Sequence, residues 1–316
     1  MPSLYMNDVL PTWLHWRSEG LACALITLVH VDGSAPRPLG SQMAVNARGE
    51  AVGNITGGCA EAAIIAEAQA RLAAGTNRLL RYGKGSPYID IRLPCGSGID
   101  VFFDVRIGVD DVRRVVDANA AREPAWIAFD FAALRATTGA GDAPQEADYL
   151  RACEPVTRIF AVGKGPLLPL LARLASIAEF EVSVMSPEEE TLEMARPHAR
   201  EARALSTPDA FQCGRLDRWT AFLSLFHEHE WEPAVLAQAM ASRCFYIGAL
   251  GSRRTAEARR DTLRAAGFDD TAIARIRGPV GLAIGAKSPP EIALAILGEI
   301  VAAKRGASGD APPPRA

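Results

Sequence analysis

The sequence of 316 residues has no long apolar run, no paired cysteine motif and no large excess of charge of either sign. No segment approaches the roughly 20 consecutive apolar residues that a membrane-spanning helix needs, and the first residues, Met1 to Trp16, lack the features of an export signal. The net charge of −3 excludes nucleic-acid binding through overall positive charge. We therefore expect a cytoplasmic protein that binds neither membranes nor nucleic acids.

The cysteines also lack the spacing of a metal site or a disulfide framework. They are scattered along the chain and form no Cys-x-x-Cys pair, so we expect no structural zinc. Thiols of a cytoplasmic protein are normally reduced. The cysteines expected to be free are Cys23, Cys59, Cys95, Cys153, Cys213 and Cys244.

The length and composition indicate two globular domains. Hydrophobic residues make up 49% and charged residues 22%, which supplies enough apolar material for two cores. Two stretches, 137–145 and 306–316, are rich in glycine, proline and polar residues and bury little apolar surface. We therefore expect an N-terminal domain over 1–136, a linker over 137–152, a C-terminal domain over 153–305 and a disordered tail after it.

The N-terminal domain is predicted to mix helices and strands, as an α/β domain. The predicted helices are 11–19 and 59–74, and the predicted strands are 23–31, 42–46, 51–55, 88–93, 99–105 and 126–131. The turn Pro94-Cys95-Gly96-Ser97-Gly98 predicts that 88–93 and 99–105 form a hairpin. We expect 126–131 to be an edge strand.

The C-terminal domain alternates strands and helices, which predicts an α/β fold with a mainly parallel sheet covered on both faces. The predicted strands are 158–162, 181–185, 221–226 and 244–249, and the predicted helices are 167–178, 233–242, 252–266 and 289–304. Ser288 and Glu291 have the spacing of a capping box at the start of the last helix.

Gly163-Lys164-Gly165 directly follows the first of these strands. In dinucleotide-binding folds, small residues here let the turn and the helix N-terminus approach a pyrophosphate. Pro166 removes one N–H, and Leu168 holds the third glycine position. The next strand ends without the acid that binds a ribose, because Glu188 lies beyond Pro187. Glycines used for packing alone are the alternative.

The segment YIGALGSRR carries Gly248 and Gly251 ahead of Ser252, a predicted N-cap. Arg253 and Arg254 then fall in the first helical turn, where each cation opposes the helix dipole at a cost of about 0.3–1 kcal/mol. A bound anion would explain both arginines. The alternative is a pair of surface or interface salt bridges.

Gly57, Gly58 and Cys59 stand between a predicted strand and a predicted helix. A helix N-terminus favours the thiolate, which binds metals or attacks sulfur, whereas Glu61 in the same turn opposes it. The glycines permit close approach of a ligand. The alternative is a small buried cysteine. Cys95 lies in the second glycine-rich turn and is also a candidate. The alternative is that it is a turn residue without a chemical role.

Two further segments have weaker signals. Ser34 and Arg37, in a loop stiffened by prolines, are candidates for binding an oxyanion, with a structural loop as the alternative. His227 and His229 follow a strand at the sheet edge where ligands bind. No third metal ligand is evident, so solvated loop residues are the favoured interpretation.

Taken together, these motifs resemble the XdhC/CoxI family of xanthine dehydrogenase accessory proteins. The resemblance is carried by Ser34-Ala35-Pro36-Arg37, Ile55-Thr56-Gly57-Gly58-Cys59-Ala60-Glu61, Pro94-Cys95-Gly96, His227-Glu228-His229, the YIGALGSRR segment and Pro279–Ala293. It covers nearly the whole chain apart from the predicted linker and tail. It implies an N-terminal XdhC/CoxI-type domain and a C-terminal Rossmann-like domain.

The resemblance implies a maturation factor more than a turnover enzyme. Such a protein binds the molybdenum cofactor, as molybdopterin or its dinucleotide form, protects it and assists its sulfuration. It then inserts the cofactor into an apo molybdenum hydroxylase of xanthine dehydrogenase or aldehyde oxidase type. The resemblance also implies a cysteine desulfurase as the partner that donates sulfur. It further implies that the chain forms a homodimer.

The same resemblance assigns roles to the candidate residues. Cys59 is the leading candidate for contact with molybdenum or its sulfur, and Cys95 the second. The residues expected to bind the cofactor are Ser34, Arg37, Gly57, Gly58, Cys59, Cys95, Gly163, Gly165, Gly248, Gly251, Ser252, Arg253 and Arg254.

Two other functions remain open. The first is an NAD(P)-dependent oxidoreductase that uses the Gly163-Lys164-Gly165 turn. Where the family commonly has Gly-Ala-Gly-His, this chain has Gly163-Lys164-Gly165-Pro166, which weakens any nucleotide role. The second is a scaffold that only docks the desulfurase to the client enzyme.

Overall fold

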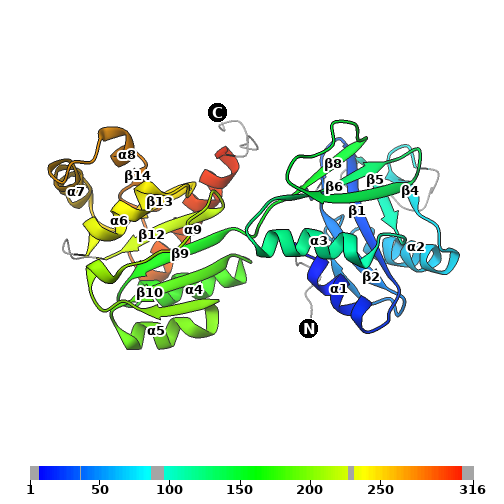
Figure 1. The fold of residues 1–316 in the computed structure, drawn as a ribbon. Helices are drawn as coiled ribbons and strands as arrows, with labels where there is room; N and C mark the ends of the chain where they lie inside the picture. Colours follow the sequence, from blue (N-terminus) through cyan, green and yellow to red (C-terminus); the bar gives the residue numbers. More distant parts are fainter. Residues whose placement is uncertain (1–6, 36, 87–95, 227–230, 308–316) are drawn as a thin grey trace. The chain divides into compact units, whose positions relative to one another are not determined.

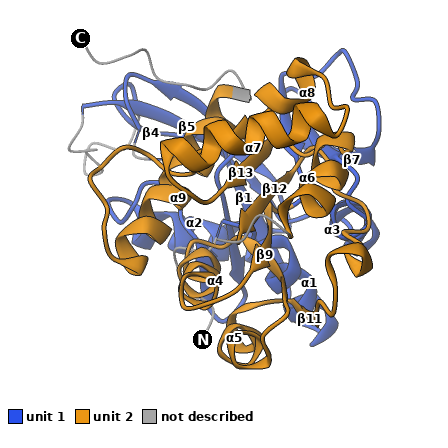
Figure 2. Cartoon of the chain, turned by 90° about the vertical axis from the view of Figure 1, so that its left-hand side faces the viewer, with its two compact units in different colours: residues 1–155 blue, residues 156–316 orange. Residues whose placement is uncertain are grey.

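The computed structural model divides the chain into two compact units, 1–155 and 156–316, which Figure 2 colours separately. Both units combine helices and strands (Figure 1), which confirms the predicted α/β class. The described residues are 7–35, 37–86, 96–226 and 231–307.

Unit 1 is built on a five-stranded antiparallel sheet, which we call sheet A. Its order is β3-β2-β1-β5-β4. The strands are β1 (Cys23–Asp32), β2 (Gln42–Asn46), β3 (Ala51–Gly53), β4 (Arg78–Gly83) and β5 (Gly98–Asp104). The central strand β1 is buried on both faces over most of its length. This burial explains its nearly continuous apolar sequence, since neither face meets solvent.

Helices and a second sheet cover the two faces of sheet A. On one face, Ile64 and Ala68 of α2 (Glu61–Ala74) pack against Ile26 and Leu28. The other face meets α1 (Leu10–Ser18), α3 (Val109–Ala120) and a three-stranded antiparallel sheet, which we call sheet B. The strands of sheet B are β6 (Ala125–Asp130), β7 (Arg135–Ala140) and β8 (Tyr149–Cys153).

Sheet B occupies the segment that we predicted as a linker over 137–152. Strand β7 pairs with β6, and β8 pairs with the other edge of β6. The central position of β6 also corrects the predicted edge strand. Gly139 is a packing residue, because a Cβ there would lie 2.2 Å from the ring of Trp126. The chain passes instead from one unit to the next between Pro155 and Val156.

The predicted hairpin of 88–93 with 99–105 is corrected in part. Strand β5 pairs with β1 and with β4, a strand that the sequence analysis did not anticipate. Residues 88–93 lie outside the described residues. Helix α3 was likewise not predicted, although Val112 and Val115 bury one of its faces.

Unit 2 contains a six-stranded parallel sheet, sheet C, with the order β11-β10-β9-β12-β13-β14. In chain order this arrangement is 3-2-1-4-5-6, the order of Rossmann folds. It confirms the predicted Rossmann-like domain. The strands are β9 (Arg158–Gly163), β10 (Glu181–Ser186), β11 (Glu201–Ala204), β12 (Thr220–Leu225), β13 (Tyr246–Ala249) and β14 (Ile276–Arg277).

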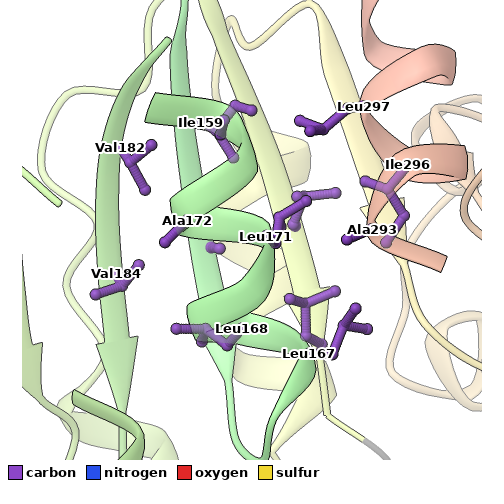
Figure 3. Close-up of a cluster of buried hydrophobic side chains, with 14 of the residues drawn as sticks. Ile159, Leu167, Leu168, Leu171, Ala172, Val182, Val184, Ala293, Ile296 and Leu297 are labelled. Carbon is purple, nitrogen blue, oxygen red and sulfur yellow. The ribbon is translucent and has the colours of Figure 1, made fainter. Parts of the chain in front are cut away.

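Helices cover both faces of sheet C (Figure 1). On one face lie α4 (Leu167–Ile177), α5 (Glu189–Ala195) and α9 (Pro289–Ala307). Figure 3 shows Leu168 and Leu171 of α4 packed between strand β10 and the α9 residues Ala293 and Ile296. The other face meets α6 (Glu232–Ala241), α7 (Arg253–Ala265) and α8 (Asp270–Ala274).

Three smaller features complete the fold. Two short 3₁₀ helices, η1 (Arg196–His198) and η2 (Pro208–Ala210), lie in the connections of unit 2. Helix α9 continues to Ala307, into the predicted tail, and 308–316 lie outside the described residues. Within the described part of the chain, no helix has both the length and the apolar character that a membrane crossing requires.

Candidate functional site

The candidate residues of unit 1 lie on loops that leave sheet A at one end. The pairing of β1 with β2, of β2 with β3 and of β1 with β5 brings together the ends of strands from which 33–41, 54–60 and 84–97 depart. A Cβ on Gly33 would lie 3.4 Å from the Cβ of Ser97, so the first and last of these loops touch. The structure thereby gathers the segments that carry Ser34, Arg37 and Cys59. Cys95 lies outside the described residues.

The loop before α2 is built around the carboxylate of Glu61. Its oxygens accept hydrogen bonds from the backbone N–H groups of Ile55, Thr56 and Gly58, at 3.1, 2.7 and 2.8 Å. They also accept one from the Thr56 hydroxyl and a longer one from the N–H of Ala60, at 3.3 Å. A single side chain therefore fixes the backbone on both sides of the two glycines.

The ionisation of Glu61 follows from these contacts. Burial opposes the charged form, but the hydrogen bonds, led by that of the Thr56 hydroxyl, outweigh burial and hold the pKa of the carboxyl below its ordinary value. The side chain is therefore a carboxylate at neutral pH, and the loop is organised before any ligand binds.

Cys59 is displayed on this loop. It is exposed and stands one residue before Ala60, the N-cap of α2, so the helix begins two residues later than predicted. Gly57 and Gly58 adopt φ values of +72° and +115°, which L side chains rarely adopt. A Cβ on Gly58 would meet no atom within 4 Å, so the space beside Cys59 is open.

The other described cysteines differ from Cys59. Cys23, Cys153 and Cys244 are buried, and Cys213 is partly buried. Burial raises the pKa of Cys23 to about 11 and raises the pKa of the other three thiols as well. Among the described cysteines, Cys59 alone is exposed, which supports the interpretation as a ligand contact over that of a buried packing residue.

Arg37 and Ser34 share the loop between β1 and β2. Ser34 is exposed, and the Arg37 Nη2 donates a hydrogen bond of 2.6 Å to Asn7 Oδ1. The Nε of Arg37 is buried without a hydrogen-bond partner among the described residues. The loop is supported from sheet B, because Arg151 Nε donates to the carbonyl of Gly40 at 2.8 Å. The sequence analysis missed Arg151, since only the fold places residue 151 beside residue 40.

A second missed residue, Arg81, joins the end of β4 to the start of β5. The Arg81 guanidinium contacts the carboxylates of Asp32 and Asp100, each at 3.2 Å, and its Nε donates to the carbonyl of Lys84. These contacts join β1, β4 and β5. The sequence spacing of these residues follows no pattern that predicts these contacts.

The candidate residues of unit 2 lie at the carboxyl edge of sheet C. The turn Gly163–Gly165 follows β9, Glu188 comes shortly after β10, and Ser252 to Arg254 follow β13. Since parallel strands end at the same edge, these segments all lie along that edge. His227 and His229, which follow β12, lie outside the described residues. Among the described residues, no cluster of three or more metal-binding side chains is found.

The two glycines of the turn after β9 differ in their surroundings. A Cβ on Gly163 would lie 2.8 Å from the backbone of Leu225, so this glycine serves the packing of β9 on β12. Gly165 has φ +78° and open space beside it. Its N–H donates to Glu188 Oε2 at 2.9 Å, and Thr191 Oγ1 lies 3.2 Å from the same nitrogen. Strand β10 ends at Ser186 without an acid, as predicted, and Glu188, two residues beyond its end, contacts the turn.

The start of α7 confirms the predicted N-cap. Ser252 Oγ accepts the N–H of Thr255 at 3.1 Å. Arg253 and Arg254 are exposed, and neither side chain forms an ion pair or a hydrogen bond with any residue that the structure describes. The alternative of surface salt bridges therefore has no support within unit 2. Gly251 and Gly248 both lie too close to neighbouring atoms for a Cβ.

A buried ion pair supports this helix start. Arg259 donates to both carboxylate oxygens of Glu232 at 3.0 and 2.8 Å, and to the carbonyl of Leu250 at 2.6 Å. The Arg259 and Glu232 side chains are only 4% and 5% exposed. The pair ties the beginning of α6 to the backbone just after β13. It was missed because the two residues lie 27 positions apart in the sequence.

Comparison with known proteins gives the same division of the chain. Residues 16–83 match the family model described as "XdhC and CoxI family", and residues 159–300 match the one described as "XdhC Rossmann domain". The chain is 31% identical over 293 residues to the molybdenum cofactor insertion chaperone PaoD of Escherichia coli, a match that covers 90% of this chain and 85% of that protein.

Two further relatives were found. The uncharacterized protein YqeB of Escherichia coli is 26% identical over 291 residues, and the chain spans less than half of its length (44%). A solved structure described as a xanthine dehydrogenase from Bacillus halodurans superimposes with a TM-score of 0.78 at 20% identity, over 97% of this chain and 98% of that one. At that identity the match shows the shared fold.

Proposed function

Because the chain belongs to the XdhC and CoxI family, we propose that it binds the molybdenum cofactor as cargo, protects it, assists its sulfuration and inserts it into a molybdenum hydroxylase. The similarity to a molybdenum cofactor insertion chaperone supports this maturation role. The client would be of xanthine dehydrogenase or aldehyde oxidase type. The protein would act as a binding and delivery factor more than as a turnover enzyme.

The observation that carries the proposal is the pair of unpartnered arginines at the start of α7. The molybdenum cofactor carries phosphate, as the end group of molybdopterin and as an internal pyrophosphate in the dinucleotide form. Arg253 and Arg254 offer two guanidinium groups beside the N–H groups of a helix start, a combination that suits phosphate. In unit 1, Ser34 and Arg37 supply hydroxyl and guanidinium donors for a further polar part of the cofactor.

Cys59 is the proposed contact to molybdenum or to its sulfur ligand. Cys59 is exposed on a fixed loop, and the space beside Gly58 is open to a ligand. A thiolate is a soft ligand that suits such a metal centre. Cys95 remains the second candidate.

The proposed partners follow from the same role. A cysteine desulfurase would supply the sulfur, and the apo molybdenum hydroxylase would receive the finished cofactor. We place these encounters in the cytoplasm and propose that the chain forms a homodimer.

The competing function, an NAD(P)-dependent oxidoreductase, has less support. It would need the N–H of Gly165 for a pyrophosphate, and Glu188 already accepts that N–H. Pro166, the N-cap of α4, offers no N–H in its place.

The proposal is tested by replacing the two arginines. Charge-assisted hydrogen bonds contribute about 1.5–3 kcal/mol each, so Arg253→Ala and Arg254→Ala should each weaken cofactor binding by about tenfold or more. The measurement is the dissociation constant for purified molybdenum cofactor under anaerobic conditions. Arg260→Ala, which removes an exposed arginine of the same helix, is the matched control and should bind as the wild type does.

The variant Cys59→Ala is tested in the same experiment, together with its ability to activate a client enzyme. It should still bind the cofactor through α7 but activate a client enzyme less well, and Cys213→Ala should activate it normally. Equal affinities in all the arginine variants would reject the α7 site. Unchanged molybdenum retention and unchanged client activation in Cys59→Ala would remove Cys59 from the mechanism.

A further inference from the structure

The turn after β9 holds a carboxylate where Rossmann folds hold a phosphate. In a sheet with this strand order, ligands bind outside the carboxyl ends of the strands where the order reverses, here between β9 and β12. The N–H of the glycine turn then donates to an anionic oxygen of the ligand. In this chain the N–H of Gly165 donates to Glu188 Oε2 at 2.9 Å.

Two buried side chains hold Glu188 in this position. The N–H of Glu188 donates to the hydroxyl of Ser186 at 3.1 Å, which fixes the backbone after β10. The hydroxyl of Thr191 donates to the same Oε2 at 2.8 Å. Ser186 is fully buried and Thr191 is 2% exposed, so the packing around both side chains restricts their movement.

The contacts also keep Glu188 negatively charged. The hydrogen bond from Thr191, followed by that from Gly165, holds the pKa of Glu188 below its ordinary value. An incoming phosphate would therefore meet a fixed like charge at the N–H of Gly165, and the next residue, Pro166, has no N–H to offer in its place.

We propose that Glu188 is a specificity-determining residue that makes the turn Gly163–Gly165 reject anionic groups, so that the phosphate end of a ligand is directed to the start of α7. The carboxylate occupies the donor position by itself, in the way that a bound phosphate oxygen would. Gly165 then serves the tight turn and the contact with Glu188, and Gly163 serves strand packing.

The test uses the full chain with Arg253 and Arg254 both replaced by alanine, so that the start of α7 contributes little anion binding. The probe is inorganic pyrophosphate, titrated by calorimetry. Glu188→Gln and Glu188→Ala on this background are compared with the parent. Glu190→Gln is the matched control, because it removes the same charge from an exposed side chain of α5.

We expect both Glu188 variants to bind pyrophosphate at least about tenfold more tightly than the parent, a gain of about 1.4 kcal/mol. The Glu190→Gln chain should bind as the parent does. In ¹⁵N-labelled Glu188→Ala protein, pyrophosphate should shift the amide resonance of Gly165, and it should leave that resonance unchanged in the parent.

Three results would overturn the proposal: equal affinity in the parent and in Glu188→Ala, an equal gain in Glu190→Gln, or a gain without movement of the Gly165 resonance. The experiment contains no molybdenum cofactor. Its failure would therefore leave the proposed delivery function standing, and a failure of the delivery function would leave this result unaffected.

Discussion

At the scale of single residues, Glu61 shows how a side chain can organise a loop that its local sequence describes only in part. We predicted that Glu61 would oppose the thiolate form of Cys59 as a like charge in the first helical turn. In the structure its carboxylate accepts hydrogen bonds from four of the backbone N–H groups between residues 55 and 60. The glycines and the cysteine were evident from the sequence, whereas the inward direction of Glu61 depends on the fold.

Replacing Glu61 with glutamine should therefore destabilise unit 1 in a pH-dependent way. The folded-state pKa of Glu61 lies below its ordinary value, so its contribution is present above the unfolded-state pKa and is lost as the pH falls through the folded-state pKa. We expect Glu61→Gln to lower the free energy of unfolding by about 1 kcal/mol at neutral pH. The difference from wild type should shrink in acid, as measured by urea unfolding.

The control for this prediction is Asp110→Asn. Asp110 forms an exposed i,i+3 pair with Arg113 on α3, and its side chain is 90% exposed. It should change stability little at either pH. A Glu61→Gln chain whose loss of stability is as large in acid as at neutral pH would contradict the account of the loop.

At the scale of helices and strands, prediction succeeded where the local pattern was strong. The apolar run of β1, the alternation of strands and helices in unit 2 and the capping box of α9 were all evident. The N–H of Ser288 donates to Glu291 at 2.9 Å, as in a capping box, and the N–H of Lys287 donates to the same carboxylate at 2.9 Å. Each of these signals lies within a few consecutive residues.

Prediction failed where an element depends on distant partners. Strand β7 is rich in Thr, Gly and Ala, which is typical of a loop, and it became a strand because β6 pairs with it. Strand β4 and the pairing of β5 likewise depend on neighbours far along the chain. For the same reason the supports of the candidate site, Arg81, Arg151 and the Glu232–Arg259 pair, could not be predicted.

The Glu232–Arg259 pair offers a test at this scale. Removing one partner leaves a buried charge without compensation, which costs about 3–5 kcal/mol, whereas replacing both often costs far less. We therefore expect Arg259→Met and Glu232→Leu each to lower the free energy of unfolding by about 3 kcal/mol. The double variant should lose much less than the sum, as measured by urea unfolding.

Arg264→Met is the comparison for that cycle. Arg264 contacts Asp261 and Asp270 at the protein surface, and its side chain is 52% exposed. It should therefore lose little stability. Strict additivity of the Arg259→Met and Glu232→Leu effects would show that the two side chains are not coupled.

At the scale of the whole molecule, the chain consists of two units that carry different parts of the proposed chemistry. Unit 1 presents an exposed cysteine on a fixed glycine loop, and unit 2 presents unpartnered arginines at the edge of a Rossmann-like sheet. The α/β class and the parallel sheet were predictable from periodicity. The unit boundary was misplaced, because the sequence of sheet B has the composition of a linker.

The function is supported at this scale by the family and by the arginines, and not by either unit's fold alone. Rossmann-like sheets serve many chemistries, so the strand order by itself does not identify a cargo. The motifs that resemble the XdhC/CoxI family were visible in the sequence. Which of their residues are exposed or engaged by neighbours became visible only in the fold, as Cys59 and Gly165 illustrate.

The most direct test of the central claim is the molybdenum and pterin content of the full chain purified anaerobically from cells that make the cofactor. The account predicts molybdenum and pterin in equal amounts, close to stoichiometric with the chain. Both should be absent when the chain is made in cells unable to synthesise the pterin. Molybdenum and pterin no higher than in an unrelated protein purified in the same way would contradict the claim that this chain carries the cofactor.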